Sequence, residues 1–387
     1  MELKRLAAWS FTSPLIIASV AALAQPAAAA PGAKATGFDV GDRFACAVIA
    51  THHVECWGLN DKGQLGDGTI TKRLKPVTVV GISKAVAVSA GVQHACAVLS
   101  TGEVKCWGFN GDGQLGDGTT TERHRPVTVV GIHHAVRVSA GAAHTCALTS
   151  GGSLRCWGDN MKGELGDGST SDSHTPVAVD GMDSHATWVS AGRYFTCGVR
   201  SGIAKCWGYN ASGQLGDGTN GDRHRPHRVA FVGGRTTIVN AGSYSTCALR
   251  KVSQGNAAFC WGTNVYGDLG DGTNDPSPLP VAVKGMSSGV TSIAPYYNTT
   301  CAVQRGAAKC WGYNIYGMVG DGSTKERHAP RQVVGLTDHA VKVSTGFYSS
   351  CALLDTGGVR CWGFGDDGQL GNGKDLNYPV PVRVHLT

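Results

Sequence analysis

A Cys-Trp-Gly tripeptide recurs seven times along this 387-residue chain and constrains the fold more than any other feature. The steps between successive tryptophans are 50, 50, 50, 54, 50 and 51 residues. A period of about 50 residues is typical of propeller and solenoid arrays, so the repeat outweighs a division into domains by length. The seven tryptophans are Trp57, Trp107, Trp157, Trp207, Trp261, Trp311 and Trp362.

Each repeat contains four short segments with the composition of β-strands. In the third repeat they are residues 135–139, 145–149, 153–157 and 176–179. Four strands in each of seven units predict an all-β fold, a seven-bladed β-propeller. Neither end has the polar capping repeat of an open solenoid, which favours a closed ring but leaves the pairing of the last strand open. We expect one domain over residues 31–387, with repeats near 38–85, 86–135, 136–186, 187–236, 237–289, 290–340 and 341–387.

The first 30 residues predict a cleaved secretory signal peptide. Lys4 and Arg5 precede an apolar run from Pro14 to Ala24, and the small residues at 26–30 offer cleavage sites. A membrane anchor is the alternative, but the run is shorter than the roughly 20 apolar residues that a span requires. We therefore expect a secreted or periplasmic protein that does not span a membrane.

Fourteen cysteines occur two to a repeat, one in the second segment and one in the third. Pairing them within a repeat leaves short hairpin loops that mostly end in glycine, although residues 50–52 lack that glycine and residues 251–256 form a longer loop. Zinc sites favour Cys-x₂₋₄-Cys, whereas directly opposed strand residues lie within disulfide reach. For an exported chain we predict seven disulfides. They are Cys46–Cys56, Cys96–Cys106, Cys146–Cys156, Cys197–Cys206, Cys247–Cys260, Cys301–Cys310 and Cys351–Cys361.

The sequence predicts no catalytic, metal or cofactor site. Histidine in Gly-x-x-His-x-Cys occurs only at His94 and His144, every cysteine has a partner, and no nucleophile–base set can be assigned. The aspartate of Leu-Gly-Asp-Gly recurs in six repeats, as expected of a turn former, and calcium loops need several oxygens at alternating positions. A formal net charge of +6 is mild for a dedicated nucleic-acid binder. We expect a non-enzymatic monomer that binds no specific nucleic acid.

Residues 38–387 resemble the regulator of chromosome condensation repeat family. The resemblance lies in Gly-x-x-His-x-Cys-Ala-Leu followed by Cys-Trp-Gly-x-Asn-x-x-Gly-Gln-Leu-Gly-Asp-Gly, with Gln64-Leu65-Gly66 and Gln114-Leu115-Gly116 in register. Met318-Val319 in the sixth repeat and Asn372 in the seventh depart from this pattern. The resemblance implies a seven-bladed propeller.

The resemblance is a weaker guide to function than to fold. The nuclear founder of the family is a guanine-nucleotide exchange factor that also binds chromatin, but the basic tail and wedge-like insertion for those activities are missing here. The chain looks more like secreted bacterial members, one of which is a β-lactamase inhibitory protein. We expect a protein-binding adaptor or inhibitor, with a carbohydrate or cell-wall binder as the alternative and an exchange factor as the least favoured reading.

The turns between the first and second strands are the predicted binding surface. Aromatic residues are concentrated there in repeats one and four to seven, and Tyr209, Tyr266, Tyr313 and Tyr316 follow in nearby loops. Exposed tyrosine and arginine are typical of protein interfaces. The alternative is that these rings pack between blades or plug the channel. The predicted partner-binding residues are Arg43, Phe44, Arg193, Tyr194, Phe195, Tyr244, Tyr296, Tyr297, Phe347 and Tyr348. The partner is expected to be an extracellular or periplasmic protein, or alternatively a cell-surface polysaccharide.

Overall fold

The computed structural model describes residues 33–231 and 234–387, and the predicted signal peptide lies outside these residues. The described residues form 28 strands in seven four-stranded antiparallel sheets. Each sheet uses four consecutive strands, so blade one holds β1–β4 and blade seven holds β25–β28. The predicted seven-bladed propeller is confirmed. No membrane-spanning helix occurs in the part of the chain that the structure describes.

The strands occupy equivalent places in successive blades. The innermost are β1 (Ala35–Val40), β5 (Ala85–Ala90), β9 (Ala135–Ala140), β13 (Ala186–Ala191), β17 (Thr236–Ala241), β21 (Val290–Tyr296) and β25 (Ala340–Thr345). The second are β2 (Phe44–Ile49), β6 (His94–Leu99), β10 (His144–Thr149), β14 (Phe195–Arg200), β18 (Ser245–Val252), β22 (Thr299–Gln304) and β26 (Ser349–Leu354). The third are β3 (Val54–Gly58), β7 (Val104–Gly108), β11 (Leu154–Gly158), β15 (Ile203–Gly208), β19 (Gly255–Gly262), β23 (Ala307–Gly312) and β27 (Val359–Gly363). The outermost are β4 (Arg73–Thr78), β8 (Arg123–Thr128), β12 (Ser173–Ala178), β16 (Arg223–Arg228), β20 (Ser277–Ala282), β24 (Arg327–Gln332) and β28 (Tyr378–Arg383).

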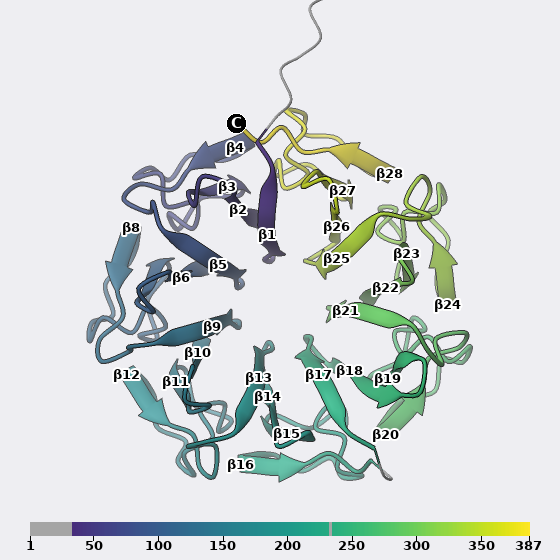
Figure 1. The fold of residues 1–387 in the computed structure, drawn as a ribbon, viewed down its shortest axis with the longest axis horizontal. Coiled ribbons are helices and arrows are strands. Elements are labelled where there is room, and N and C mark those ends of the chain that lie inside the picture. Colours follow the sequence, from purple (N-terminus) through teal and green to yellow (C-terminus); the bar gives the residue numbers. More distant parts are fainter. Residues whose placement is uncertain (1–32, 232–233) are drawn as a thin grey trace, which may run out of the picture. The chain divides into compact units, whose positions relative to one another are not determined.

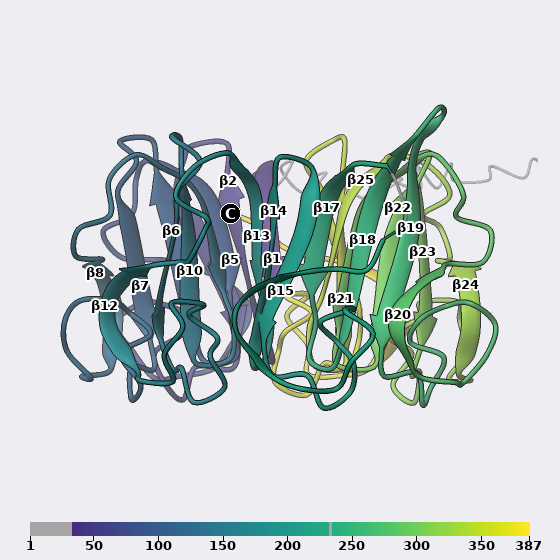
Figure 2. The ribbon, with the colours of Figure 1, turned by 90° about the horizontal axis from the view of Figure 1, so that it is seen from below.

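Residues of the seven inner strands line a central channel, and the blades stand side by side around it (Figures 1 and 2). The last strand, β28, pairs with β27 inside its own blade, which answers the question that the sequence left open. Contacts between blades seven and one therefore close the ring. Gly373 N donates to Leu74 O at 2.9 Å, and the Thr387 hydroxyl donates to a carboxylate oxygen of Glu55 at 2.5 Å.

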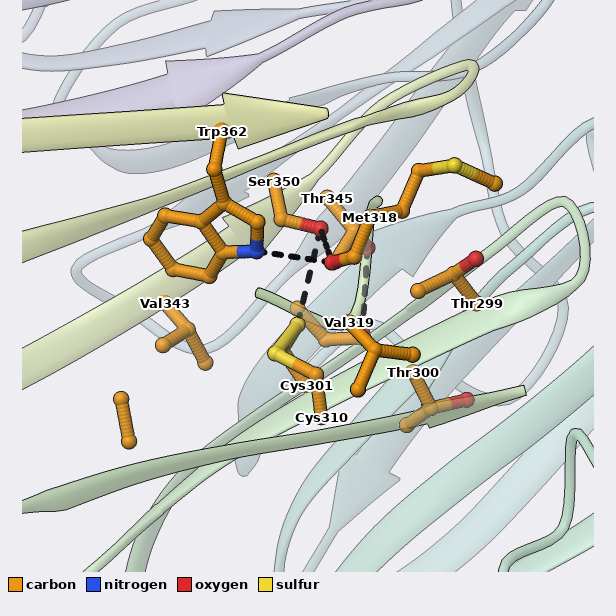
Figure 3. Close-up of a disulfide and its surroundings, with 12 residues drawn as sticks. Thr299, Thr300, Cys301, Cys310, Met318, Val319, Val343, Thr345, Ser350 and Trp362 are labelled. Atoms are coloured by element: carbon orange, nitrogen blue, oxygen red, sulfur yellow. Dashed lines mark hydrogen bonds between the residues drawn. A yellow bond between two sulfur atoms is a disulfide. The ribbon is translucent and has the colours of Figure 1, made fainter. Parts of the chain in front are cut away.

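The tryptophan of every repeat joins its blade to the preceding one. In blade seven, the indole nitrogen of Trp362 donates to Met318 O at 2.7 Å, and the Ser350 hydroxyl donates to the same oxygen at 3.0 Å (Figure 3). Trp57 makes the equivalent bond to Gln369 O at 2.9 Å, across the seam. All seven rings are fully buried, where an indole N–H needs an acceptor. The Cys-Trp-Gly period thus records one inter-blade contact repeated around the ring.

The glycine of Gln-Leu-Gly leaves room for that contact. Gly66 has φ of 65°, which favours glycine, and a Cβ there would lie 2.8 Å from the indole nitrogen of Trp107 in the next blade. The tryptophan and this glycine in the preceding blade are therefore two halves of one packing unit.

All seven predicted disulfides are confirmed, one in each blade between directly opposed residues of its second and third strands. The pairing of Arg200 with Ile203 leaves the expected two-residue turn. In the first hairpin, His52 takes the left-handed φ of 63° that glycine supplies elsewhere. The long loop expected at 251–256 is wrong, because β18 and β19 continue pairing as far as Val252 and Gly255.

Candidate functional site

The turns between first and second strands and the long loops between third and fourth strands emerge on one face of the propeller. Backbone bonds tie each turn to the start of the loop in the same blade. Leu59 N donates to Arg43 O at 2.9 Å in blade one, and Phe364 N donates to Tyr348 O at 2.8 Å in blade seven. These paired segments place the predicted binding residues on a common surface, which we call the loop face.

Phe44 and Phe195 do not belong to the exposed part of the loop face. Each begins the second strand of its blade and is 0% exposed. Phe44 packs in a core cluster with Leu65 and Trp107, and Phe195 packs in the equivalent cluster of blade four. Second strands are sandwiched between neighbouring blades, so both faces are buried. For these two residues the packing alternative applies, and we remove them from the binding surface.

Seven rings from blades five to seven form a continuous group, which we call the aromatic cluster. Tyr348 lies at its centre, with ring centroids 3.9 Å from Phe347, 5.5 Å from Tyr297 and 5.2 Å from Tyr316. Edge-to-face and tilted contacts of this kind stabilise aromatic groups beyond area burial alone. The structure brings Tyr297, Phe347 and Tyr348 together, as the sequence placed them on one surface. The members are Tyr266, Tyr297, Tyr313, Tyr316, Phe347, Tyr348 and Phe364.

The aromatic cluster is only partly covered by its own packing. All seven rings keep intermediate exposure. Val265 and Ile315 stand directly before Tyr266 and Tyr316 in the long loops and are 58% and 52% exposed. Scattered apolar residues are normal on a surface, but apolar residues grouped with aromatic rings mark an interaction site.

Two tyrosines of the cluster have strained backbones. Tyr297 has φ of 47° and Tyr348 has φ of 63°, in the left-handed region that bulky residues seldom adopt. Each such residue costs about 1–3 kcal/mol and is held by its surroundings.

Arg43 extends the aromatic cluster across the seam into blade one. Its guanidinium carbon lies 5.5 Å from the centroid of Phe347, and a terminal nitrogen lies 3.6 Å from a carboxylate oxygen of Asp367. The side chain of Arg43 is 44% exposed. A partner that covers Phe347 would therefore meet this cation as well.

Arg193, Tyr194 and Tyr244 lie outside the aromatic cluster. The Arg193 guanidinium lies 5.5 Å from the ring centroid of Tyr194, which packs edge-on against Tyr209 at 6.3 Å. All three predicted residues are partly exposed. Arg193, Tyr194 and Tyr209 form a second and smaller group in blade four.

Tyr296 lies outside the aromatic cluster: it lines the central channel and is partly exposed. It replaces the turn glycine of the other six repeats, where a Cβ at Gly41 would collide with the carbonyl oxygen of Gly91. Strand β21 is one residue longer as a result, and Tyr296 pairs with Thr299 across a two-residue turn. The Tyr296 hydroxyl donates to a carboxylate oxygen of Asp42 at 3.2 Å. Burial and the nearby Asp42 carboxylate hold the pKa of Tyr296 well above its usual value.

The long loops of blades two and three give the loop face an acidic sector. Burial, together with the neighbouring Asp172 carboxylate, raises the pKa values of Asp112 and Asp159. Glu164 stands where four repeats carry glutamine and is 1% exposed. One of its oxygens accepts a hydrogen bond from Lys162 N at 2.8 Å. Burial, and secondarily the carboxylates of Asp159 and Asp172, raise the pKa of Glu164 to about 8.

Glu164 is expected to make stability fall as pH rises from about 4.5 to about 8. Across this window the folded carboxyl keeps its proton while the unfolded one loses it, so the folded state binds more protons. Glu164→Gln keeps the acceptor and removes the charge, and should raise the free energy of unfolding by about 2 kcal/mol at pH 8 with little change at pH 4.5. Urea titrations at both pH values measure the difference.

Gln214→Glu is the reciprocal control for this prediction. Gln214 occupies the equivalent position in blade four, and its Oε1 accepts from Ser212 N at 2.9 Å. This variant should acquire the pH dependence that Glu164→Gln loses. Parallel stability–pH profiles for wild type and Glu164→Gln would contradict the assignment.

Sequence reasoning missed several members of the loop-face site. Phe364, Val265 and Ile315 occupy variable positions just after Cys-Trp-Gly, where the other repeats carry Leu59 or Asp61, for example. Comparing the repeats position by position would have shown β-branched apolar residues at the second of these positions only in blades five and six, as Val265 and Ile315. The basic residues of the same loops contribute less, because the best placed are already paired. Arg123 and Arg223, for example, lie 3.0 Å and 2.8 Å from carboxylate oxygens of Asp117 and Asp217.

Solved structures with the same fold include two proteins of known source. Human WBSCR16 aligns with a TM-score of 0.75 and 22% identity, covering 86% of this chain and 94% of that one. Prp20p of Saccharomyces cerevisiae, in a study of its binding to Gsp1p and histones, aligns with a TM-score of 0.73 and 20% identity, covering 91% and 87%. At these identities the likeness concerns the fold alone. No curated protein sequence matches the chain significantly.

The family assignment comes from the repeats themselves. The regulator of chromosome condensation (RCC1) repeat matches residues 53–98, 101–148, 152–199, 206–249, 256–303, 308–353 and 356–387. A second form of the repeat matches residues 85–114, 135–164 and 340–369. Most of these units begin near a third strand and end in the second strand of the next blade, so they span the tryptophan contact between blades. The chain therefore belongs to the regulator of chromosome condensation repeat family.

Proposed function

We propose that this protein is a secreted, non-catalytic propeller that binds another protein through the aromatic cluster. One observation carries the proposal: seven partly exposed rings, together with the exposed Val265 and Ile315, are gathered on the loop face of blades five to seven. Tyrosines of this kind dominate the energetics of protein interfaces. An adaptor or an inhibitor would use such a surface without catalysis.

The loop face has features that would orient a protein partner. The aromatic cluster lies in blades five to seven, with Arg43 at its edge, whereas Asp112 and Asp159 lie in the loops of blades two and three. A partner with an apolar patch beside a basic patch would complement both sectors. Charges at the rim mainly set orientation and association rate, and the buried centre sets affinity.

The disulfides favour an oxidising location for this activity. Seven disulfides are typical of exported proteins and rare in the cytosol or nucleus. They agree with the signal peptide that the sequence predicts. Guanine-nucleotide exchange, which the family resemblance suggests, remains the least favoured function because its small GTPase partner is intracellular.

A polysaccharide is the second candidate partner. Sugars stack on open ring faces, and the cluster supplies several tyrosines. Its rings, however, are tilted by 55° between Tyr316 and Tyr348 and by 84° between Tyr297 and Tyr348, so they do not form a flat platform. This geometry favours an irregular protein surface over a sugar chain.

Affinity capture with the oxidised protein separates these candidates. The bait is presented both to the proteins of its own surroundings and to cell-wall polysaccharides. Tyr297→Ala/Tyr348→Ala is the test variant, and Phe109→Ala in the loop of blade two is the matched control. A protein retained by wild type and control but lost by the test variant supports the proposal. Retention by polysaccharide alone, or equal retention of the protein by all three baits, contradicts it.

A further inference from the structure

The channel contains a cavity of about 460 Å³ that residues of all seven inner strands line. This volume falls within the range of small-molecule sites. Side chains at the third and fifth positions of the inner strands line it. Most are small or polar, but blade three contributes Arg137, blade seven contributes Lys342 and blade one contributes Asp39. The cavity thus holds two cations and one anion.

Arg137 is held in place without an ion-pair partner. Its Nε donates to Val189 O at 3.0 Å, and the guanidinium carbon lies 3.5 Å from the ring centroid of Trp188. Trp188 is itself fixed, since its indole nitrogen donates to Asn240 Oδ1 at 3.0 Å. Burial lowers the pKa of Arg137 to about 10, so it remains a cation at neutral pH. Its two terminal nitrogens have no acceptor among the described residues.

Asp39 does not neutralise Arg137 by contact. One carboxylate oxygen accepts from the Ser344 hydroxyl at 2.8 Å, and the other accepts from the Ser89 hydroxyl at 3.0 Å and from Ala90 N at 3.1 Å. These three donors belong to blades seven and two, on either side of blade one. The carboxylate therefore joins three blades at the seam and is already satisfied.

Two serines beside Arg137 have hydroxyl protons without an acceptor. Ser139 Oγ accepts from Ala191 N at 2.9 Å, and Ser190 Oγ accepts from Ala241 N at 3.0 Å. Each of these oxygens serves as an acceptor, so its own proton is free to donate into the cavity. Among the residues that the structure describes, neither hydroxyl donates to the protein. This side of the cavity consequently offers a surplus of donors and a positive charge.

We propose that the channel binds a small oxyanion, a carboxylate or a phosphate-type group, through Arg137, Ser139 and Ser190. A planar guanidinium with free terminal nitrogens matches the geometry of carboxylate and phosphate oxygens. Lys342 adds a second positive charge, although its Nζ also donates to Phe38 O at 2.5 Å. The cavity contains two positive charges and one carboxylate that already accepts hydrogen bonds. A bound anion would therefore neutralise the remaining positive charge.

The proposed site is independent of the aromatic cluster. At the loop face Tyr296 bonds to Asp42 and lines the end of the cavity. At the other end the cavity is lined by Val86, Val136 and Val341, which are each about half exposed. A ligand would therefore enter from the face opposite the protein-binding surface.

Titration of the oxidised protein with single anions tests the proposal. Inorganic phosphate, acetate and succinate are added separately at constant ionic strength, and tryptophan fluorescence and isothermal heat are recorded. Trp188 is the partly exposed indole among the described residues, so binding should change its emission. We expect saturable binding by wild type, an affinity at least about tenfold weaker in Arg137→Gln, and no change in the exposed control Arg155→Gln.

The three anions distinguish the source of the oxyanion. Saturation by phosphate alone identifies a phosphate-type ligand, and saturation by acetate or succinate identifies a carboxylate. Either result supports the proposal if Arg137→Gln weakens it. Ser139→Ala/Ser190→Ala provides the same test if Arg137→Gln fails to fold. Absence of saturable binding by every anion, or equal affinity in wild type and the cavity variants, overturns the proposal.

Discussion

Reduction of the seven disulfides is expected to unfold the propeller. Each bond closes a short hairpin loop and contributes roughly 2–3 kcal/mol in the chain-entropy model. Together these contributions, about 14–21 kcal/mol, equal or exceed the 5–15 kcal/mol by which folded proteins are usually stable. The seven repeat tryptophans are fully buried, so unfolding should shift their fluorescence strongly to the red. Emission spectra and thermal melts of reduced, alkylated protein measure the effect.

A single-bond variant is the control for this prediction. Cys197→Ala/Cys206→Ala removes one bond and should lower the free energy of unfolding by about 2–3 kcal/mol while leaving the fold intact. Untreated oxidised protein provides the reference melt. A reduced and alkylated protein with the same emission spectrum and the same melting temperature would contradict the stabilising role of the disulfides.

Tyr348→Ala is expected to weaken partner binding by at least about 30-fold, the loss expected from a hot-spot tyrosine. The ring contacts five others in the aromatic cluster, so its removal also disorders its neighbours. The loss of folding stability should be smaller, about 1–2 kcal/mol, because these contacts lie on the surface. Interferometry with the captured partner measures affinity, and urea titration measures stability.

Phe109→Ala controls for the general effect of removing a loop aromatic. Phe109 occupies the position in blade two that Tyr313 occupies in blade six, outside the aromatic cluster. It should change affinity less than about threefold. A collapse of stability in Tyr348→Ala, with affinity per folded molecule unchanged, would mean that the cluster is a packing element and not a binding surface.

The architecture could be predicted from the sequence because one physical contact repeats. Each Cys-Trp-Gly supplies both the disulfide partner and the indole that reaches the preceding blade. The glycine of Gln-Leu-Gly is spaced to receive that indole. The hairpin registers followed from the cysteine spacing, except where β18 and β19 extended their pairing. These features can be recognised in the sequence because every blade makes equivalent contacts with the blades on either side.

The binding residues were harder to predict because exposure depends on packing between blades. Phe44 directly follows the exposed Arg43, but it is the first residue of β2, a strand that neighbouring blades cover on both sides. Because both faces of such a strand are buried, apolar and polar residues do not alternate along it, and the sequence does not show which side chains are exposed. Tyr296 was hard to place for a different reason. It stands at a glycine position of the repeat, and only the register of β21 directs its side chain into the channel.

Site-specific photocrosslinking tests the central claim, that the aromatic cluster contacts a protein partner, most directly. A photoreactive phenylalanine replaces Ile315, which is 52% exposed beside Tyr316, and in a second protein it replaces Met161, which is 73% exposed at the same repeat position in blade three. Both oxidised proteins are irradiated in their own surroundings. The account predicts one defined protein adduct from position 315 and little or none from position 161. Adducts of equal yield from both positions, or from position 161 alone, would contradict it.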